Sequence, residues 1–145
     1  MPDEQTGLSK AERDAMKQRA AELRKESQQG RGRKAASDEA DVLAKIEGMP
    51  EPDRSLAGRI HAIVTEVAPD LRPKLWYGQP AYARGFKVVC FFRSGSDDAE
   101  RFSTFGFTAE AALDEGGFWP TSYAVSELSA DALAQVRTLV TRAAG

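Results

Sequence analysis

The sequence predicts an α+β domain in which helices pack on an antiparallel sheet of about four to five strands. Two observations lead to this fold class. Helix-forming segments come first, strand-forming segments cluster in the middle, and one more helical segment follows them. Short turns join the successive strands, and strands joined in this way pair antiparallel. The chain has 145 residues, which is the length of one domain.

An extra, highly charged helix is predicted near the N-terminus, over residues 9–28. Ser9 and Glu12 have the spacing of a capping box, and good helix formers follow them. The apolar side of this helix is thin and consists of three residues, Met16, Ala20 and Leu23. The helix is therefore expected to gain little by burial.

A flexible linker is predicted over residues 28–34, where glycines alternate with basic residues. Ser37 is then expected to begin a second, short helix, which Gly48 ends. The sequence thus predicts two parts: a charged helix with its linker over residues 1–36, and the α+β domain over residues 37–145.

Two further helices have an apolar side that is expected to face the core. One runs from about Asp53 to Val67, and its apolar residues recur at spacings of three and four. The other follows Ser129, which is a good N-cap residue. Its apolar side consists of Leu133, Val136, Val140 and Ala143.

Short strands are predicted between these two helices, where aromatic and β-branched residues alternate with Gly and Pro. They are Lys74–Tyr77, Ala81–Arg84, Lys87–Phe92, Phe102–Phe107 and Trp119–Val125. The third is the most apolar and is expected at the centre of the sheet. Residues 110–113 have the composition of a single helical turn.

The charge of the chain is unevenly distributed. Residues 1–36 carry nine Lys/Arg and six Asp/Glu, a net charge of +3, whereas residues 37–145 carry eleven and sixteen, a net charge of −5. Ordinary solvated surface charge is the favoured interpretation, ahead of a nucleic-acid-binding arm. In a further alternative, the basic arm folds against the acidic body of its own chain.

The sequence favours a cytoplasmic protein without a membrane partner. Its apolar runs are all shorter than the roughly 18 residues that cross a bilayer, and its N-terminus does not have the pattern of a secretory signal. Cys90 is the only cysteine, which excludes an internal disulfide.

Motifs of several enzyme classes are missing from the sequence. One cysteine and one histidine cannot supply a zinc site, and neither a phosphate-binding loop nor a GxSxG turn occurs. A nucleophilic pair would have to consist of Cys90 and His61. Because Cys90 lies in the most apolar strand and His61 lies at the edge of a helix's apolar side, structural roles are expected for both.

An aromatic turn is the candidate binding site. The candidate residues are Trp76, Tyr77, Gly78, Gln79, Pro80 and Tyr82, with Trp119 from a later strand. Strand alternation puts Trp76 and Tyr77 on opposite faces, so at least one of them is expected to line a groove or an interface. Packing in the core is the alternative role. Nucleic acid is not expected on the sheet, because its strands carry few basic residues.

Carboxylates cluster in two predicted loops and are the candidate metal ligands. They are Asp97, Asp98, Glu100, Asp114 and Glu115. The favoured interpretation is solvated surface. Weak binding of a hard cation is the alternative, since such ions prefer clustered oxygen ligands.

Taken in order, four segments resemble the YdhG-like family, long catalogued as a domain of unknown function. They are Trp76–Tyr82, Lys87–Phe92, Phe105–Phe107 and Trp119–Thr121. The family is typified by a Tyr-Gly-Met-Pro-Ala-Phe/Tyr turn and a Gly-Lys hairpin that leads into an apolar strand, preceded by a helix that residues 59–64 resemble. The similarity spans about residues 38–143. Two departures stand out: Gln79 replaces the usual Met, and Gly85-Phe86-Lys87 replaces Gly-Lys.

The resemblance implies an antiparallel sheet with packed helices and no known enzymatic activity. Some members of the family are described as frataxin-like iron chaperones, which hold ferrous iron on surface carboxylates, so iron is the one metal that the resemblance implies. The sequence therefore predicts a non-catalytic binding protein without a resident cofactor. The alternative is a protein- or nucleic-acid-interaction module that uses the aromatic turn and the basic arm.

Overall fold

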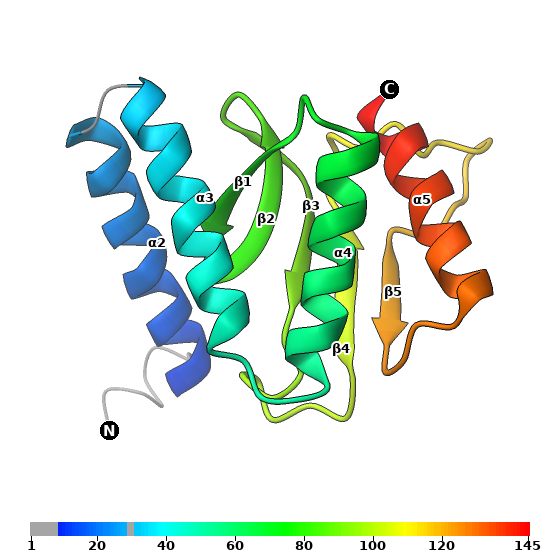
Figure 1. Ribbon diagram of the computed structural model, residues 1–145, viewed down its shortest axis with the longest axis horizontal. Helices are drawn as coiled ribbons and strands as arrows, with labels where there is room; N and C mark the ends of the chain where they lie inside the picture. Colours follow the sequence, from blue (N-terminus) through cyan, green and yellow to red (C-terminus); the bar gives the residue numbers. More distant parts are fainter. Residues whose placement is uncertain (1–8, 29–30) are drawn as a thin grey trace.

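The structure, a computed structural model, describes residues 9–28 and 31–145. In this part of the chain, four helices and a five-stranded antiparallel sheet form the predicted α+β fold (Figure 1). The helices are α2 (Lys10–Gln28), α3 (Arg31–Glu47), α4 (Asp53–Val67) and α5 (Ala130–Ala144). The strands are β1 (Arg72–Trp76), β2 (Gln79–Arg84), β3 (Lys87–Arg93), β4 (Ser103–Phe107) and β5 (Ser122–Val125).

The sheet is a meander in which the order of the strands in space is their order in the chain. Each strand pairs antiparallel with the next, and β3 lies at the centre, as its apolar sequence predicts. A register shift between Tyr82 and Ala83 marks a β-bulge where β2 meets β3. Such a bulge increases the local twist of the strand pair.

One face of the sheet carries the main core. Tyr82, Cys90 and Phe107 are cross-strand neighbours on this face, and α3, α4 and α5 lie side by side over it (Figure 1). In α4, Leu56, Ile60 and Val64 recur every four residues and are buried. The spacing of three and four that predicted this helix is therefore also what places it on the sheet.

The helix α5 begins as predicted. The hydroxyl of Ser129 accepts a hydrogen bond from the backbone N–H of Ala132 at 3.2 Å, which satisfies one of the free donors of the first turn. Three residues of its apolar side, Val136, Val140 and Ala143, are buried.

The opposite face of the sheet has a smaller cluster. Ala81, Ala83 and Val88 are buried there under the half-buried rings of Trp76 and Phe91. The two rings lie 5.5 Å apart, centroid to centroid. Trp76 is thus part of the packing on this face.

Three predictions from the sequence need correction. The second helix begins at Arg31 instead of Ser37, so residues 31–34 are helical and the predicted boundary at residue 37 falls inside α3. The rest of the predicted linker, residues 29–30, lies outside the described residues. The single helical turn expected at 110–113 is irregular structure, and the last strand begins at Ser122 instead of Trp119.

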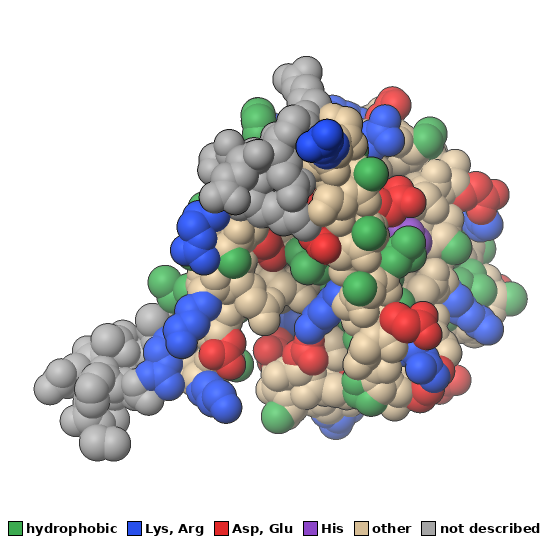
Figure 2. Space-filling model, turned by 60° about the vertical axis from the view of Figure 1, so that its left-hand side comes forward, with side chains coloured by type: hydrophobic (Ala, Val, Ile, Leu, Met, Phe, Trp, Pro, Cys, Tyr) green, Lys and Arg blue, Asp and Glu red, His purple; other side chains and the backbone are tan. Residues whose placement is uncertain are grey.

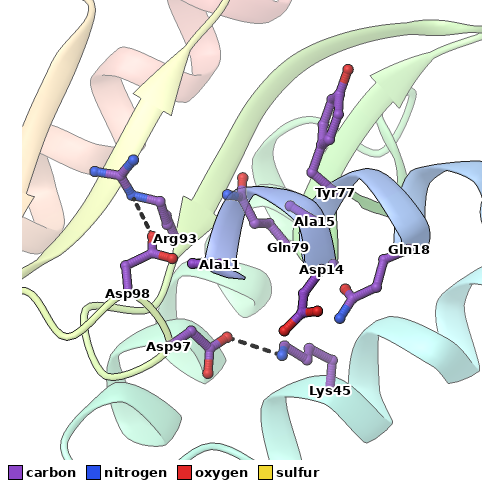
Figure 3. Close-up of a pocket in the computed structure, with 11 residues that line it drawn as sticks. Ala11, Asp14, Ala15, Gln18, Lys45, Tyr77, Gln79, Arg93, Asp97 and Asp98 are labelled. Atoms are coloured by element: carbon purple, nitrogen blue, oxygen red, sulfur yellow. Dashed lines mark ion pairs between the residues drawn. The ribbon is translucent and has the colours of Figure 1, made fainter. Parts of the chain in front are cut away.

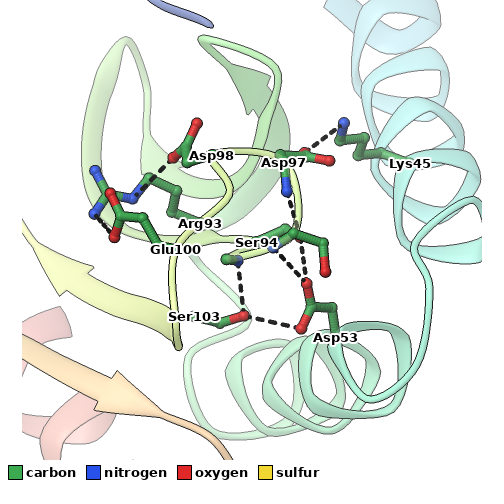
Figure 4. Close-up of polar contacts among 10 residues, drawn as sticks. Lys45, Asp53, Arg93, Ser94, Asp97, Asp98, Glu100 and Ser103 are labelled. Carbon is green, nitrogen blue, oxygen red and sulfur yellow. Dashed lines mark hydrogen bonds and ion pairs between the residues drawn. The ribbon is translucent and has the colours of Figure 1, made fainter.

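A buried carboxylate fixes the loop between β3 and β4 to the start of α4 (Figure 4). Asp53 accepts hydrogen bonds from the hydroxyls of Ser94 at 2.5 Å and Ser103 at 3.1 Å, and from the backbone N–H of Ser96 at 3.2 Å. Burial by itself raises the pKa of Asp53, but the hydrogen bonds from Ser94, Ser96 and Ser103 outweigh it, so the pKa lies below its ordinary value. This network sets the position of the acidic residues that follow in the loop.

Among the helices that the structure describes, none is both long and apolar enough to span a bilayer.

Candidate functional site

A polar cleft of about 240 Å³ lies where three segments that are distant in the sequence meet beside Lys45 of α3. The first turns of α2 form one side, the turn between β1 and β2 forms the second, and the loop after β3 forms the third (Figure 3). Its charged lining residues are Asp14, Lys45, Arg93, Asp97 and Asp98. In the space-filling view, a hollow between the N-terminal helix and the rest of the molecule has charged side chains on its rim (Figure 2).

The β1–β2 turn presents its backbone to α2. Trp76 pairs with Gln79, so Tyr77 and Gly78 form a two-residue turn, and both have positive φ, 53° and 75°. This is the conformation of a type I′ turn, which matches the twist of the flanking strands. Glycine adopts it readily, whereas a tyrosine rarely does.

The helix α2 contacts this turn through polar side chains. The carboxylate of Glu22 accepts hydrogen bonds from the backbone N–H groups of Tyr77 at 3.3 Å and Gly78 at 3.2 Å. The amide oxygen of Gln18 lies over Gly78 so closely that a Cβ atom there would be 1.6 Å from it. The positive φ of residue 78 therefore favours glycine, and a larger residue there would also force the Gln18 side chain to move.

The apolar side of α2 is only half covered by the rest of the protein. Met16 is 53% exposed and Leu23 is 49% exposed, whereas the side chain of Glu22 is 14% exposed. Desolvation raises the pKa of Glu22, although its hydrogen bonds with the turn and its attraction to Arg19 act in the opposite direction. As expected from its thin apolar side, this helix gains little from apolar burial.

The acidic loop at the cleft is paired with cations. Asp97 lies 2.9 Å from the Lys45 Nζ atom, and Arg93 lies 3.2 Å from Asp98 and 3.3 Å from Glu100 (Figure 4). Burial raises the pKa of Asp98, while the nearby guanidinium of Arg93 lowers it in part. Much of the negative charge of the loop is therefore balanced within the protein.

The structure brings together only some of the predicted site residues. Tyr77, Gly78 and Gln79 line the cleft with Asp97 and Asp98. The remaining candidates lie elsewhere or within the core, as follows: Pro80 and Tyr82 are fully buried, Trp76 packs on the opposite face of the sheet, and Trp119 packs against the main core. The alternation argument fails for Tyr77, because it belongs to the turn and not to the strand.

The second predicted carboxylate cluster lies apart from the cleft. Asp114 and Glu115 are exposed in the segment between β4 and β5, and Glu115 forms an ion pair with Arg142 of α5 at 2.8 Å. Among residues 9–28 and 31–145, no three His, Cys, Asp or Glu side chains are grouped so that they could hold a metal ion.

Sequence reasoning missed the cations and the helix residues of the site. Lys45 lies on α3 and Arg93 ends the apolar strand β3, so nothing local marks them as neighbours of the turn. Arg93 offered one signal, because a charged residue follows the most apolar run of the chain. Glu22 and Gln18 offered none.

Cys90 and His61 do not form a reactive pair. Burial raises the pKa of the Cys90 thiol to about 12, so the thiol stays protonated near neutral pH. The Nδ1 atom of His61 instead shares a hydrogen bond of 2.9 Å with the hydroxyl of Tyr82. Cys90 is thus part of the main core, and His61 is bonded to another residue of that core.

The chain was compared with known proteins at three levels. It matches no protein-family model, no curated protein and no solved structure.

Proposed function

We propose that this chain is a non-catalytic binding protein of the YdhG-like type, whose small polar ligand occupies the cleft between α2, the β1–β2 turn and the loop after β3. One observation carries the proposal. Four segments from different parts of the sequence meet at a hollow that is lined by amide side chains and by charged side chains of both signs. Such a convergence of polar groups is what fixes the orientation of a bound molecule.

The size and polarity of the cleft define the class of ligand. At about 240 Å³ it is smaller than the roughly 300–1,000 Å³ of sites for drug-sized molecules. Arg93 and Lys45 can pair with an anionic group, and Asp14 with a cationic one. A small ligand that carries charge or several hydrogen-bonding groups therefore fits the cleft better than an apolar one.

The state of the reactive side chains supports binding without catalysis. A protonated, buried thiol at Cys90 is a poor nucleophile. His61 is directed into the protein toward Tyr82 and does not line the cleft. Among the residues that line the cleft, Lys45 already pairs with Asp97 and Arg93 with Asp98.

The proposal is tested by a ligand screen in solution. ¹⁵N-labelled full-length protein is titrated with amino acids, dicarboxylic acids, nucleosides and, without oxygen, ferrous iron. We expect shifts at residues 77–79 and 97–98 for at least one class, and loss of that binding in Lys45→Gln and Arg93→Gln. Lys87→Gln is the matched control, because Lys87 is 73% exposed and does not line the cleft. Shifts elsewhere, or none with any compound, contradict the proposal.

Ferrous iron is the ligand that the family resemblance adds to this screen. In its favour, Asp97 and Asp98 bring carboxylate oxygens to the cleft. An ion there would have to compete with Lys45 and Arg93 for these oxygens. Calorimetry under reducing conditions decides the question: saturable heat that is lost in Asp97→Asn supports an iron carrier, and no heat at millimolar iron excludes one.

A further inference from the structure

The β1–β2 turn directs two neighbouring backbone N–H groups at a single carboxylate. Tyr77 and Gly78 both have positive φ, and their N–H groups lie 3.3 and 3.2 Å from the two oxygen atoms of Glu22. Successive N–H groups that face the same way form a concave site of positive potential, which favours an anion. The donors belong to the backbone of a tight turn and are therefore fixed before any ligand arrives.

A third donor lies near the same carboxylate at a long distance. The Nη1 atom of Arg19 is buried and has no hydrogen-bond partner among the described residues. It forms an ion pair with Glu22, 3.5 Å from Oε1, which is longer than a good hydrogen bond. A buried N–H without a partner is costly. Glu22 therefore fills this group of donors incompletely.

Little apolar contact holds Glu22 in this place. The helix that carries it exposes its apolar side, with Met16 and Leu23 each about half exposed. Gly78, which donates to Glu22, also lines the cleft. A ligand in the cleft thus reaches the turn if only the Glu22 side chain rotates away.

We infer that the N–H groups of Tyr77 and Gly78, together with Arg19, form a carboxylate-binding site, and that Glu22 occupies it as an internal stand-in for the carboxylate of the ligand. The ligand class is a small organic carboxylate whose remaining polar groups lie in the cleft. This inference rests on the proposed function, since it names the group by which the cleft ligand is held.

The test measures binding of acetate and succinate to the full-length chain by the amide shifts of Tyr77 and Gly78. Glu22→Ala removes the internal competitor, so we expect its affinity for these carboxylates to exceed that of the wild type on the order of tenfold. Glu22→Gln keeps a neutral acceptor and is expected to lie between the two. Arg19→Gln in the Glu22→Ala background should weaken binding again.

Two controls keep the result specific. Glu12→Ala changes another exposed carboxylate on α2 and should leave carboxylate affinity unchanged. Methylammonium should not shift the two amides. Retention of the α2 amide resonances in Glu22→Ala shows that the helix is intact; if that variant loses the helix, the comparison of Glu22→Gln with the wild type decides.

The possible failures are distinct. Equal carboxylate affinity in the wild type and the intact Glu22 variants, or tighter binding of inorganic phosphate than of succinate, overturns this inference. In either case the proposed function stands if another ligand still shifts residues 97–98 in a Lys45-dependent way. Absence of any such ligand overturns the proposed function instead.

Discussion

The hydroxyl of Tyr82 on β2 lies 2.9 Å from the Nδ1 atom of His61 on α4, and this hydrogen bond joins the sheet to the central helix. Tyr82 is fully buried and His61 is half-buried. Burial raises the pKa of the Tyr82 hydroxyl, so it keeps its proton. The contact therefore persists as a neutral hydrogen bond throughout the physiological pH range.

Tyr82→Phe is expected to destabilise the fold by about 1 kcal/mol, because it removes one buried hydrogen bond without changing the packed ring. Chemical denaturation with the free energy of unfolding as readout measures this change. Tyr77→Phe is the matched control, since Tyr77 is an exposed turn residue, and it should change the free energy of unfolding much less. An equal loss in both variants would show that the Tyr82–His61 hydrogen bond contributes nothing.

His61 is expected to make the protein less stable in mild acid. Desolvation lowers its pKa below 6.5, and the attraction of Glu39 offsets this only in part. Below pH 6.5 the unfolded chain therefore binds a proton that the folded chain does not, and stability falls as the pH drops from 6.5 to the folded-state pKa. The single histidine allows its folded-state pKa to be read directly by NMR titration. A value at or above 6.5 would contradict this prediction.

Asp53→Ala should cost about 2–3 kcal/mol, because it leaves the buried hydroxyls of Ser94 and Ser103 without their acceptor. The lowered pKa of Asp53 also implies a pH effect. The ionised Asp53 carboxylate stabilises the fold fully above its unfolded-state pKa. This stabilisation is lost as the pH falls through the lower folded-state pKa. Denaturation of Asp53→Ala and of the exposed control Asp70→Ala at neutral and acid pH separates these effects. If Asp70→Ala loses as much free energy of unfolding as Asp53→Ala, the hydrogen bonds of Asp53 do not stabilise the fold.

Gly106→Ala and Gly58→Ala are expected to change stability in opposite directions. A Cβ atom at residue 106 would lie 2.4 Å from Cζ of Phe91, so the ring must move and the variant should lose about 1–3 kcal/mol. At residue 58, within α4, a Cβ atom meets nothing within 4 Å, and alanine should add about 0.5–1 kcal/mol. Thermal unfolding of both variants measures the difference, and a neutral Gly106→Ala would show that Phe91 is free to shift.

Local sequence patterns predicted the elements whose own residues bury an apolar side. The bounds of α4 follow from Leu56, Ile60 and Val64, and the central position of β3 follows from its run of apolar residues. The start of α3 was missed because Gly32 and its flanking basic residues have the local pattern of a linker. In the structure, the 2.6 Å ion pair between Lys34 and Asp38 supports this part of the helix.

Sequence patterns can predict only those parts of the site whose residues are neighbours in the chain. The sequence predicted a turn over residues 78–80, between strands ending at Tyr77 and beginning at Ala81, whereas the turn of the structure consists of Tyr77 and Gly78. Its contact with Glu22 spans 55 residues, and no periodicity links two segments so far apart. The same limit applies to the pairing of Lys45 with Asp97. For Trp76 the sequence left a groove and the core open as alternatives, and in the structure its half-buried ring packs on the smaller apolar cluster of the sheet.

The meander order of the sheet has a consequence for how the chain reaches its native state. Every strand pairs with its immediate successor, so no pairing has to wait for a remote segment to arrive. Proteins with contacts between near neighbours along the chain cross their folding barrier faster than those that must close long loops. The strands can therefore pair one after another, from β1 to β5, while the polypeptide is still emerging from the ribosome.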